Sequence, residues 1–205
     1  MIVKVCGMRD KANISALAQL KPTMIGFIFY EKSPRYVGST AMETPSEISR
    51  VGVFVNASFD EIISKAQSFK LSHVQLHGSE SAELCRKLQG SGLKVIKAIS
   101  VEGESDLEAC KKYDSVVDFI LLDTKCSQYG GSGRRFDWNI LSSYHAEAPF
   151  LLSGGIDEDM AEEITLICHP KFKGVDLNSR FEISPGVKNI EKLTNFISTI
   201  KNITQ

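Results

Sequence analysis

Short apolar runs alternate with segments of helical periodicity along the chain. The runs are rich in Val, Ile, Leu and Phe and often end at a polar residue, as buried strands do. The segments between them repeat apolar residues every three or four positions, as amphipathic helices do. The runs predict eight strands, over residues 3–6, 24–29, 51–55, 73–76, 94–99, 119–122, 150–152 and 174–177. The other segments predict helices over residues 13–20, 60–69, 81–88, 106–113, 157–168 and 187–200.

This alternation is typical of parallel strands joined by right-handed helical crossovers. Eight strands favour a closed α/β barrel, the (βα)8 or TIM barrel, over an open doubly wound sheet. An open sheet of six strands stays an alternative if two of the runs are not strands. Residues 40–49 make a poor helix because Pro45 interrupts them. The length of 205 residues suits one barrel, so we expect a single domain over residues 1–205.

Charge and cysteine content indicate which class of partner the protein binds and which cellular compartment it occupies. The chain has 24 Lys and Arg against 25 Asp and Glu, which gives no overall field to attract nucleic acid or an anionic membrane. We therefore expect a small-molecule partner, no nucleic acid and no membrane. No run of about 18 apolar residues predicts a membrane span. Five scattered cysteines and an N-terminus unlike a signal peptide predict a reduced, cytoplasmic protein.

Polar side chains follow the predicted strands at their carboxyl ends, where α/β barrels place their chemistry. Cys6 ends the first run and Asp123 follows the sixth. Taken singly, a buried Cys is usually a small hydrophobe and a lone Asp a helix cap. Taken together at one barrel mouth, a base-like and an acid-like group predict proton transfer. The other ends have Tyr30 with Ser33-Pro34-Arg35, Asn56, His77, Ser100, Ser153-Gly154-Gly155 and Asp176-Leu177-Asn178-Ser179.

Lys4 precedes Cys6 by two residues, so both side chains lie on the same side of the strand, about 6.6 Å apart along its axis. An ammonium group near a thiol favours the thiolate. We therefore expect Lys4 to lower the pKa of Cys6, whose unperturbed value of about 8.5 would leave little thiolate at neutral pH.

The last two strand ends predict a phosphate site. Loops after strands seven and eight of such barrels commonly bind a phosphoryl group through backbone N–H groups, and small residues let the anion approach. Gly154, Gly155, Asn178 and Ser179 fit this site. The alternative is that the two glycines simply make a tight turn into a helix capped by Asp157.

A second glycine-rich stretch, Gly130-Gly131-Ser132-Gly133, is not interpreted as a phosphate loop, because it lacks the Gly-Lys-Ser/Thr ending of a nucleotide P-loop. We expect a flexible lid between Asp123 and a helix near Phe136-Asp137-Trp138.

Several motifs, in this order and spacing, resemble the phosphoribosylanthranilate isomerase family of tryptophan biosynthesis. The resemblance runs nearly end to end. It implies a (βα)8 barrel that converts N-(5-phosphoribosyl)anthranilate into 1-(2-carboxyphenylamino)-1-deoxyribulose 5-phosphate, an Amadori rearrangement without a metal or an organic cofactor. The motifs are Lys4-Val5-Cys6-Gly7, Gly26-Phe27-Ile28-Phe29, Ser33-Pro34-Arg35-Tyr36, Val53-Phe54-Val55-Asn56, Val74-Gln75-Leu76-His77-Gly78, Asp123 before Gly130-Gly131-Ser132-Gly133, Leu152-Ser153-Gly154-Gly155 and Ser184-Pro185-Gly186-Val187-Lys188.

The resemblance also implies roles for single residues. Cys6 is similar to the family's general base and Asp123 to its general acid. Arg35 would bind the carboxylate of the substrate through its planar guanidinium. His77 and Asp176 are expected to bind substrate, although a backbone bond for His77 and a purely structural role for Asp176 stay open.

Two positions depart from the family pattern. Asn178-Ser179-Arg180 stands where many members have Ser-Ser-Gly, so that Arg180 either reinforces phosphate binding or points outward. Asn189 stands where an Asp often follows the Pro-Gly-x-Lys stretch. Neither change affects the expected acid and base.

Two other functions remain alternatives: another phosphosugar isomerase or epimerase on the same barrel, and a phosphosugar-binding protein without catalysis. A metal-dependent epimerase would need His and Asp ligands on several strand ends, and few are available here. Both a monomer and a homodimer are compatible with the sequence.

Overall fold

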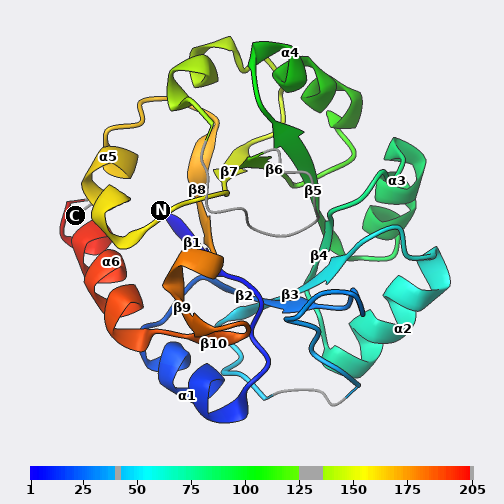
Figure 1. The fold of residues 1–205 in the computed structure, drawn as a ribbon. Coiled ribbons are helices and arrows are strands. Elements are labelled where there is room, and N and C mark those ends of the chain that lie inside the picture. Colours follow the sequence, from blue (N-terminus) through cyan, green and yellow to red (C-terminus); the bar gives the residue numbers. More distant parts are fainter. Residues whose placement is uncertain (40–42, 125–135, 204–205) are drawn as a thin grey trace.

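Eight parallel strands close into a barrel in the computed structural model, which describes residues 1–39, 43–124 and 136–203. The strands follow one another in chain order around the barrel, and the last pairs with the first (Figure 1). The predicted TIM barrel is confirmed. The strands are β1 (Ile2–Val5), β2 (Met24–Ile28), β3 (Ser49–Phe54), β4 (His73–Leu76), β5 (Lys94–Val101), β6 (Phe119–Thr124), β7 (Phe150–Leu152) and β8 (Phe172–Leu177).

Helices surround the strands on the outside (Figure 1). Most of them cover the barrel with an apolar face; in α2 and α3 the first turn is capped by Ser58 and Ser81, whose hydroxyls accept backbone N–H groups. The α-helices are α1 (Lys11–Gln19), α2 (Phe59–Phe69), α3 (Ala82–Gly90), α4 (Glu104–Leu107), α5 (Ala161–Thr165) and α6 (Ile190–Ile203). The 3-10 helices are η1 (Glu108–Tyr113), η2 (Trp138–Ser143), η3 (Glu158–Met160) and η4 (Ser179–Phe181).

Side chains of the strands divide into two apolar layers. One layer lies inside the barrel, and the other lies between the barrel and the helices. Because both faces are buried, the strands are almost continuously apolar, as expected for a parallel sheet. The interior layer consists of Met24, Val51, Ile96, Ala98, Leu121 and Leu151. Above it, Cys6, Ile28 and Val53 form a smaller cluster, against which Tyr30 packs.

The strand β6 is longer than predicted. It extends to Thr124 because it pairs with β5 up to Val101, so Asp123 lies within the strand and not after it. The predicted helix over residues 157–168 is wrong in extent, since only η3 and α5 form there.

A short hairpin replaces the start of the predicted helix over residues 187–200. β9 (Glu182–Ser184) and β10 (Val187–Lys188) pair antiparallel, with Lys188 opposite Glu182, and α6 begins only at Ile190. Gly186 turns the chain between them with φ +85°. Side chains of Glu182 and Lys188 are thereby brought together, which the apolar periodicity did not predict.

None of the helices in the described part of the chain has the length and apolar character to cross a membrane.

The buried His73 on β4 is expected to make the fold sensitive to acid. Burial, assisted by the nearby Lys94 ammonium, lowers the pKa of His73 to about 4 from 6.5. The unfolded chain therefore binds a proton at His73 as pH falls below about 6.5, whereas the folded chain resists it, so stability is lost between about pH 6.5 and 4. Between these pH values, the free energy of unfolding measured with urea should fall less steeply with pH in His73→Gln than in the parent. The same replacement at the exposed His145 serves as the control, and equal slopes in all three proteins would contradict the prediction.

Candidate active site

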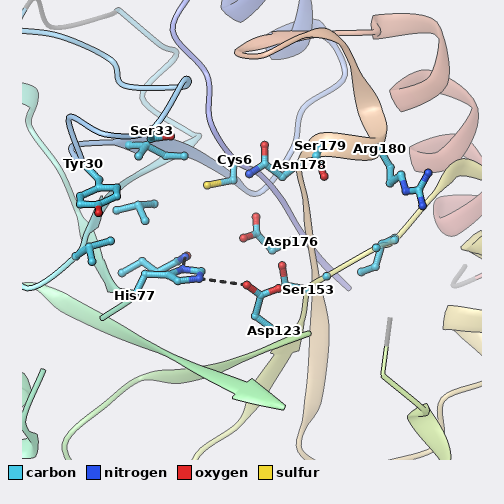
Figure 2. Close-up of a pocket in the computed structure, with 17 residues that line it drawn as sticks. Cys6, Tyr30, Ser33, His77, Asp123, Ser153, Asp176, Asn178, Ser179 and Arg180 are labelled. Carbon is cyan, nitrogen blue, oxygen red and sulfur yellow. Dashed lines mark hydrogen bonds and ion pairs between the residues drawn. The ribbon is translucent and has the colours of Figure 1, made fainter. Parts of the chain in front are cut away.

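A pocket opens at the carboxyl ends of the strands, lined by both polar and apolar side chains. The polar strand ends predicted to converge do so here (Figure 2). Among the predicted site residues, those that line the pocket are Cys6, His77, Asp123, Gly154, Gly155, Asp176, Asn178 and Ser179. Arg35 is not among the lining residues.

Cys6 follows β1 directly and is only 3% exposed. Its backbone N–H donates to the carbonyl of Leu177, at 2.9 Å, so the closing strand β8 holds it in place. Gly26 on β2 makes room for the thiol: a Cβ at this position would lie 2.8 Å from Cys6 Sγ. The sulfur is thus seated in a close-packed wall of the pocket.

Lys4 acts on the pKa of Cys6 in the predicted downward direction, but the net shift of this pKa is upward. Burial raises the pKa of the Cys6 thiol, and the negative charge of Asp176 adds to this effect. Lys4 and Lys188 act in the opposite direction but do not offset burial. Desolvation is the dominant effect, and Asp176, the counter-ion of Lys4, partly cancels the effect of the ammonium on the thiol.

Asp176 lies between Cys6 and Asp123 in the pocket (Figure 2). Lys4 Nζ forms an ion pair with Asp176, at 2.8 Å from Oδ2. The other oxygen, Oδ1, is buried and has no hydrogen-bond partner among the described residues. Burial raises the pKa of Asp176 in spite of Lys4, and the neighbouring Asp123 acts in the same direction. A buried oxygen without a partner at a pocket wall is suited to a substrate hydroxyl or amine.

His77, which directly follows β4, contacts Asp123 on β6. His77 Nε2 lies 3.1 Å from Asp123 Oδ2, and both side chains keep some exposure, at 21% and 15%. The second ring nitrogen, Nδ1, lies 2.9 Å from the side-chain amide nitrogen of Gln75. Sequence reasoning named Gln75 only as part of a motif and assigned it no role; its place two residues before His77, near the end of β4, is the signal that could have indicated the contact.

Two loops with small residues form the far side of the pocket. Gly154 and Gly155 have φ of +82° and +70°, and no described residue accepts a hydrogen bond from their N–H groups. A Cβ at Gly154 would collide with Thr124, so this turn requires glycine. Asp157 caps η3 through a bond of 2.8 Å to the Glu158 N–H, so the turn also leads into a capped helix, as the alternative predicted.

Beside this turn lie Asn178, Ser179 and Arg180 (Figure 2). Asn178 Oδ1 accepts a hydrogen bond from Lys188 Nζ at 2.7 Å, which fixes the side chain at the base of the second loop. Arg180 lines the pocket with an exposed side chain, so its cation adds positive charge on the side where phosphate is predicted.

Arg35 lies beside the pocket, paired with a carboxylate of the protein itself. Its Nε and Nη2 atoms donate to Glu182 at 2.7–3.0 Å. Lys188 Nζ, fully buried, lies 2.7 Å from the same carboxylate. Although burial acts to raise it, hydrogen bonds from Arg35 and Lys188 hold the pKa of Glu182 below its usual value. Sequence reasoning missed Glu182 and placed Lys188 only in a motif, because their pairing depends on the hairpin.

The predicted lid at Gly130-Gly131-Ser132-Gly133 lies outside the described residues. Within the described part, no group of three His, Cys, Asp or Glu side chains is placed to hold a metal ion.

Comparison with known proteins gives consistent matches over the length of the chain. The family model described as N-(5'phosphoribosyl)anthranilate (PRA) isomerase matches residues 3–199. N-(5'-phosphoribosyl)anthranilate isomerase of Parabacteroides distasonis is 50% identical over 206 residues, covering 98% of this chain and 93% of the relative.

Solved structures of the same family have the same fold. The phosphoribosyl anthranilate isomerase of Thermotoga maritima superposes with a TM-score of 0.83 at 33% identity, covering 98% of this chain and 100% of that one. A second structure of this kind is a complex with reduced 1-(o-carboxyphenylamino)-1-deoxyribulose 5-phosphate; it has a TM-score of 0.81 at 32% identity, with coverage of 98% and 100%.

Replacing Gly26 by Ala should displace the thiol and destabilise the fold. The added Cβ would lie 2.8 Å from Cys6 Sγ and 3.1 Å from Cys6 Cα, so the strand or the thiol has to shift. We expect a loss of about 1–3 kcal/mol in the free energy of unfolding, measured by urea denaturation. Gly90→Ala, where a Cβ meets nothing within 4 Å, is the control and should be neutral or slightly stabilising. Equal stability of Gly26→Ala and the parent would contradict the close packing around Cys6.

Proposed function

Because the chain belongs to the N-(5'-phosphoribosyl)anthranilate isomerase family, we propose that Cys6 and Asp123 perform the two proton transfers of that reaction in its pocket. The activity itself is the isomerisation of N-(5'-phosphoribosyl)anthranilate in tryptophan biosynthesis. The assignment of the two residues is carried by one observation: the thiol of Cys6, directly after β1, and the carboxyl group of Asp123, on β6, line the same pocket. The matches do not favour another phosphosugar reaction or a binding role.

The rearrangement needs an acid first. Asp123 gives a proton to the ring oxygen of the furanose, the bond from this oxygen to C1 breaks, and the lone pair of the anthranilate nitrogen forms a protonated Schiff base at C1. His77 next to Asp123 stabilises the carboxylate that remains, because its Nε2 lies within hydrogen-bond distance of Oδ2.

A base is needed next. The Cys6 thiolate takes the proton from C2, and the electrons of the C–H bond neutralise the Schiff base to give an enolamine. Transfer of a proton to C1 and loss of the proton on the C2 oxygen then produce the ketone. If Cys6 gives the first of these protons and Asp123 accepts the second, both groups return to their starting states.

The two ends of the substrate are both acidic and suit the two sides of the pocket. The phosphate would lie at Gly154, Gly155, Asn178 and Ser179, where the N–H groups of the glycine turn have no acceptor among the described residues and favour an anion. Arg35 would bind the anthranilate carboxylate through Nη1, for which no described residue is an acceptor, while Glu182 orients the guanidinium. Asp176 would contact the sugar through its unpaired Oδ1.

Removing either group of the proposed pair should lower turnover by on the order of 10²–10⁴, the usual contribution of one positioned acid or base. Cys6→Ala and Asp123→Asn are to be assayed by the loss of anthranilate-type fluorescence with freshly generated N-(5'-phosphoribosyl)anthranilate. The exposed Cys168→Ala and Asp60→Asn are matched controls and should keep the parental rate. Near-parental turnover in a folded Cys6→Ala or Asp123→Asn would remove that residue from the mechanism.

The buried thiol predicts a rate that still rises with pH above neutrality. A base acts only when deprotonated, and burial raises the pKa of Cys6, so the rising limb of kcat/KM should extend beyond about pH 8.5, the value of an ordinary thiol. Cys6→Asp should move this limb to lower pH, because a carboxyl group loses its proton in a more acidic range. A parental limb that levels off well below pH 8 would show that Cys6 is not the titrating base.

A further inference from the structure

We propose that Gln75 is a positioning residue for the general acid: its side-chain amide keeps His77 in the tautomer that donates from Nε2 to Asp123. This inference rests on the proposed role of Asp123. It assigns a specific task to a side chain that the sequence analysis named only as part of a motif and gave no role.

The three side chains form a chain of contacts across β4 and β6. The amide nitrogen of Gln75 is 2.9 Å from His77 Nδ1, and His77 Nε2 is 3.1 Å from Asp123 Oδ2. Gln75 is 1% exposed and lines the pocket wall, so water does not compete freely for its amide. Gln75 is on β4 and His77 directly follows this strand, and their contact shows that both side chains lie on the same side.

The amide group determines which ring nitrogen bears the proton. A neutral imidazole has one donor and one acceptor nitrogen, and an amide NH2 can only donate. Since the Gln75 nitrogen faces Nδ1, this atom accepts and Nε2 must bear the hydrogen. His77 then donates to Asp123 Oδ2 and does not accept from it.

The direction of the hydrogen bond between His77 and Asp123 matters for proton donation by Asp123. With Oδ2 accepting from His77, the acidic proton of Asp123 sits on Oδ1, for which no described residue is a partner. Its donation leaves a carboxylate already hydrogen-bonded to Nε2–H, which stabilises the product of the transfer. In the opposite tautomer, the Nε2 lone pair would attract the proton of Asp123 and draw it away from the substrate.

The amide itself is held mainly by this contact. Gln75 Oε1 is buried and has no hydrogen-bond partner among the described residues. An unpaired buried carbonyl is energetically costly, because it has lost its hydrogen bonds to water. A side chain kept at this position in spite of that cost is consistent with a requirement for the nitrogen at His77 Nδ1, whereas an apolar side chain would fill the same space without an unpaired atom.

Histidine 15N NMR tests the tautomer without depending on activity. The chain has four histidines, and the His77 signals are identified by their loss in His77→Gln. In the parent at neutral pH, we expect His77 to show a protonated Nε2 and an unprotonated Nδ1. In Gln75→Met, which removes the donor, we expect a mixture of tautomers, and in Gln75→Glu a protonated Nδ1, because a carboxylate can only accept.

Kinetics show whether the tautomer matters. Gln75→Met and Gln75→Glu should lower kcat by roughly 10- to 100-fold, less than the full contribution of a general acid, with little change in KM. Gln67→Met, at an exposed position of α2, should change neither the His77 signals nor kcat.

The outcomes separate the inference from the proposed function. An Nδ1-protonated His77 in the parent overturns the inference even if both Gln75 variants fail to fold. Changed tautomers with an unchanged kcat also overturn it, but leave Asp123 as the acid, since that role is tested separately by Asp123→Asn. A parent without turnover would refute the proposed function, and the role given to Gln75 would fall with it, whatever the NMR spectra showed.

Discussion

The pairing of β1 with β8 closes the barrel, and the candidate site depends on this closure. The register places Lys4 beside Asp176 and aligns Val5 with Leu177, whose carbonyl accepts the N–H of Cys6. Gly174 permits the approach, because a Cβ there would collide with the backbone of Ile2. The first and last strands of the chain thus build one wall of the pocket together, and the other strands bring their carboxyl ends to the same mouth.

Closure also buries charges, and the site is organised by how these charges are paired. Lys4 with Asp176 and Lys188 with Glu182 are buried ion pairs, in which each partner compensates part of the desolvation of the other. The Lys4 ammonium is therefore not a free activator of the thiol, and burial raises the pKa of Cys6. Arg35 shares Glu182 with Lys188, which links the loop after β2 to the hairpin after β8.

Sequence patterns predicted the strands better than the elements around them. All eight predicted strands exist, because parallel strands buried on both faces leave a continuous apolar signal. The helix over residues 157–168 was overestimated, and the start of the last helix is a hairpin, because Gly186 and the pairing of Glu182 with Lys188 outweigh the helical periodicity there. Strand pairing extended β6 over Asp123, which no local pattern indicated.

The sequence by itself determined the barrel, the positions of its strands and the convergence of Cys6, His77 and Asp123 on one mouth, because these follow from periodicity and from the parallel direction of the strands. Only the tertiary structure decided which polar groups contact each other. His77 reaches Asp123 across 46 residues, Gln75 reaches His77 inside the barrel, and Arg35 meets Glu182 from a distant loop. Side-chain partners and pKa shifts depend on distances and burial in three dimensions, which periodicity along the chain does not contain.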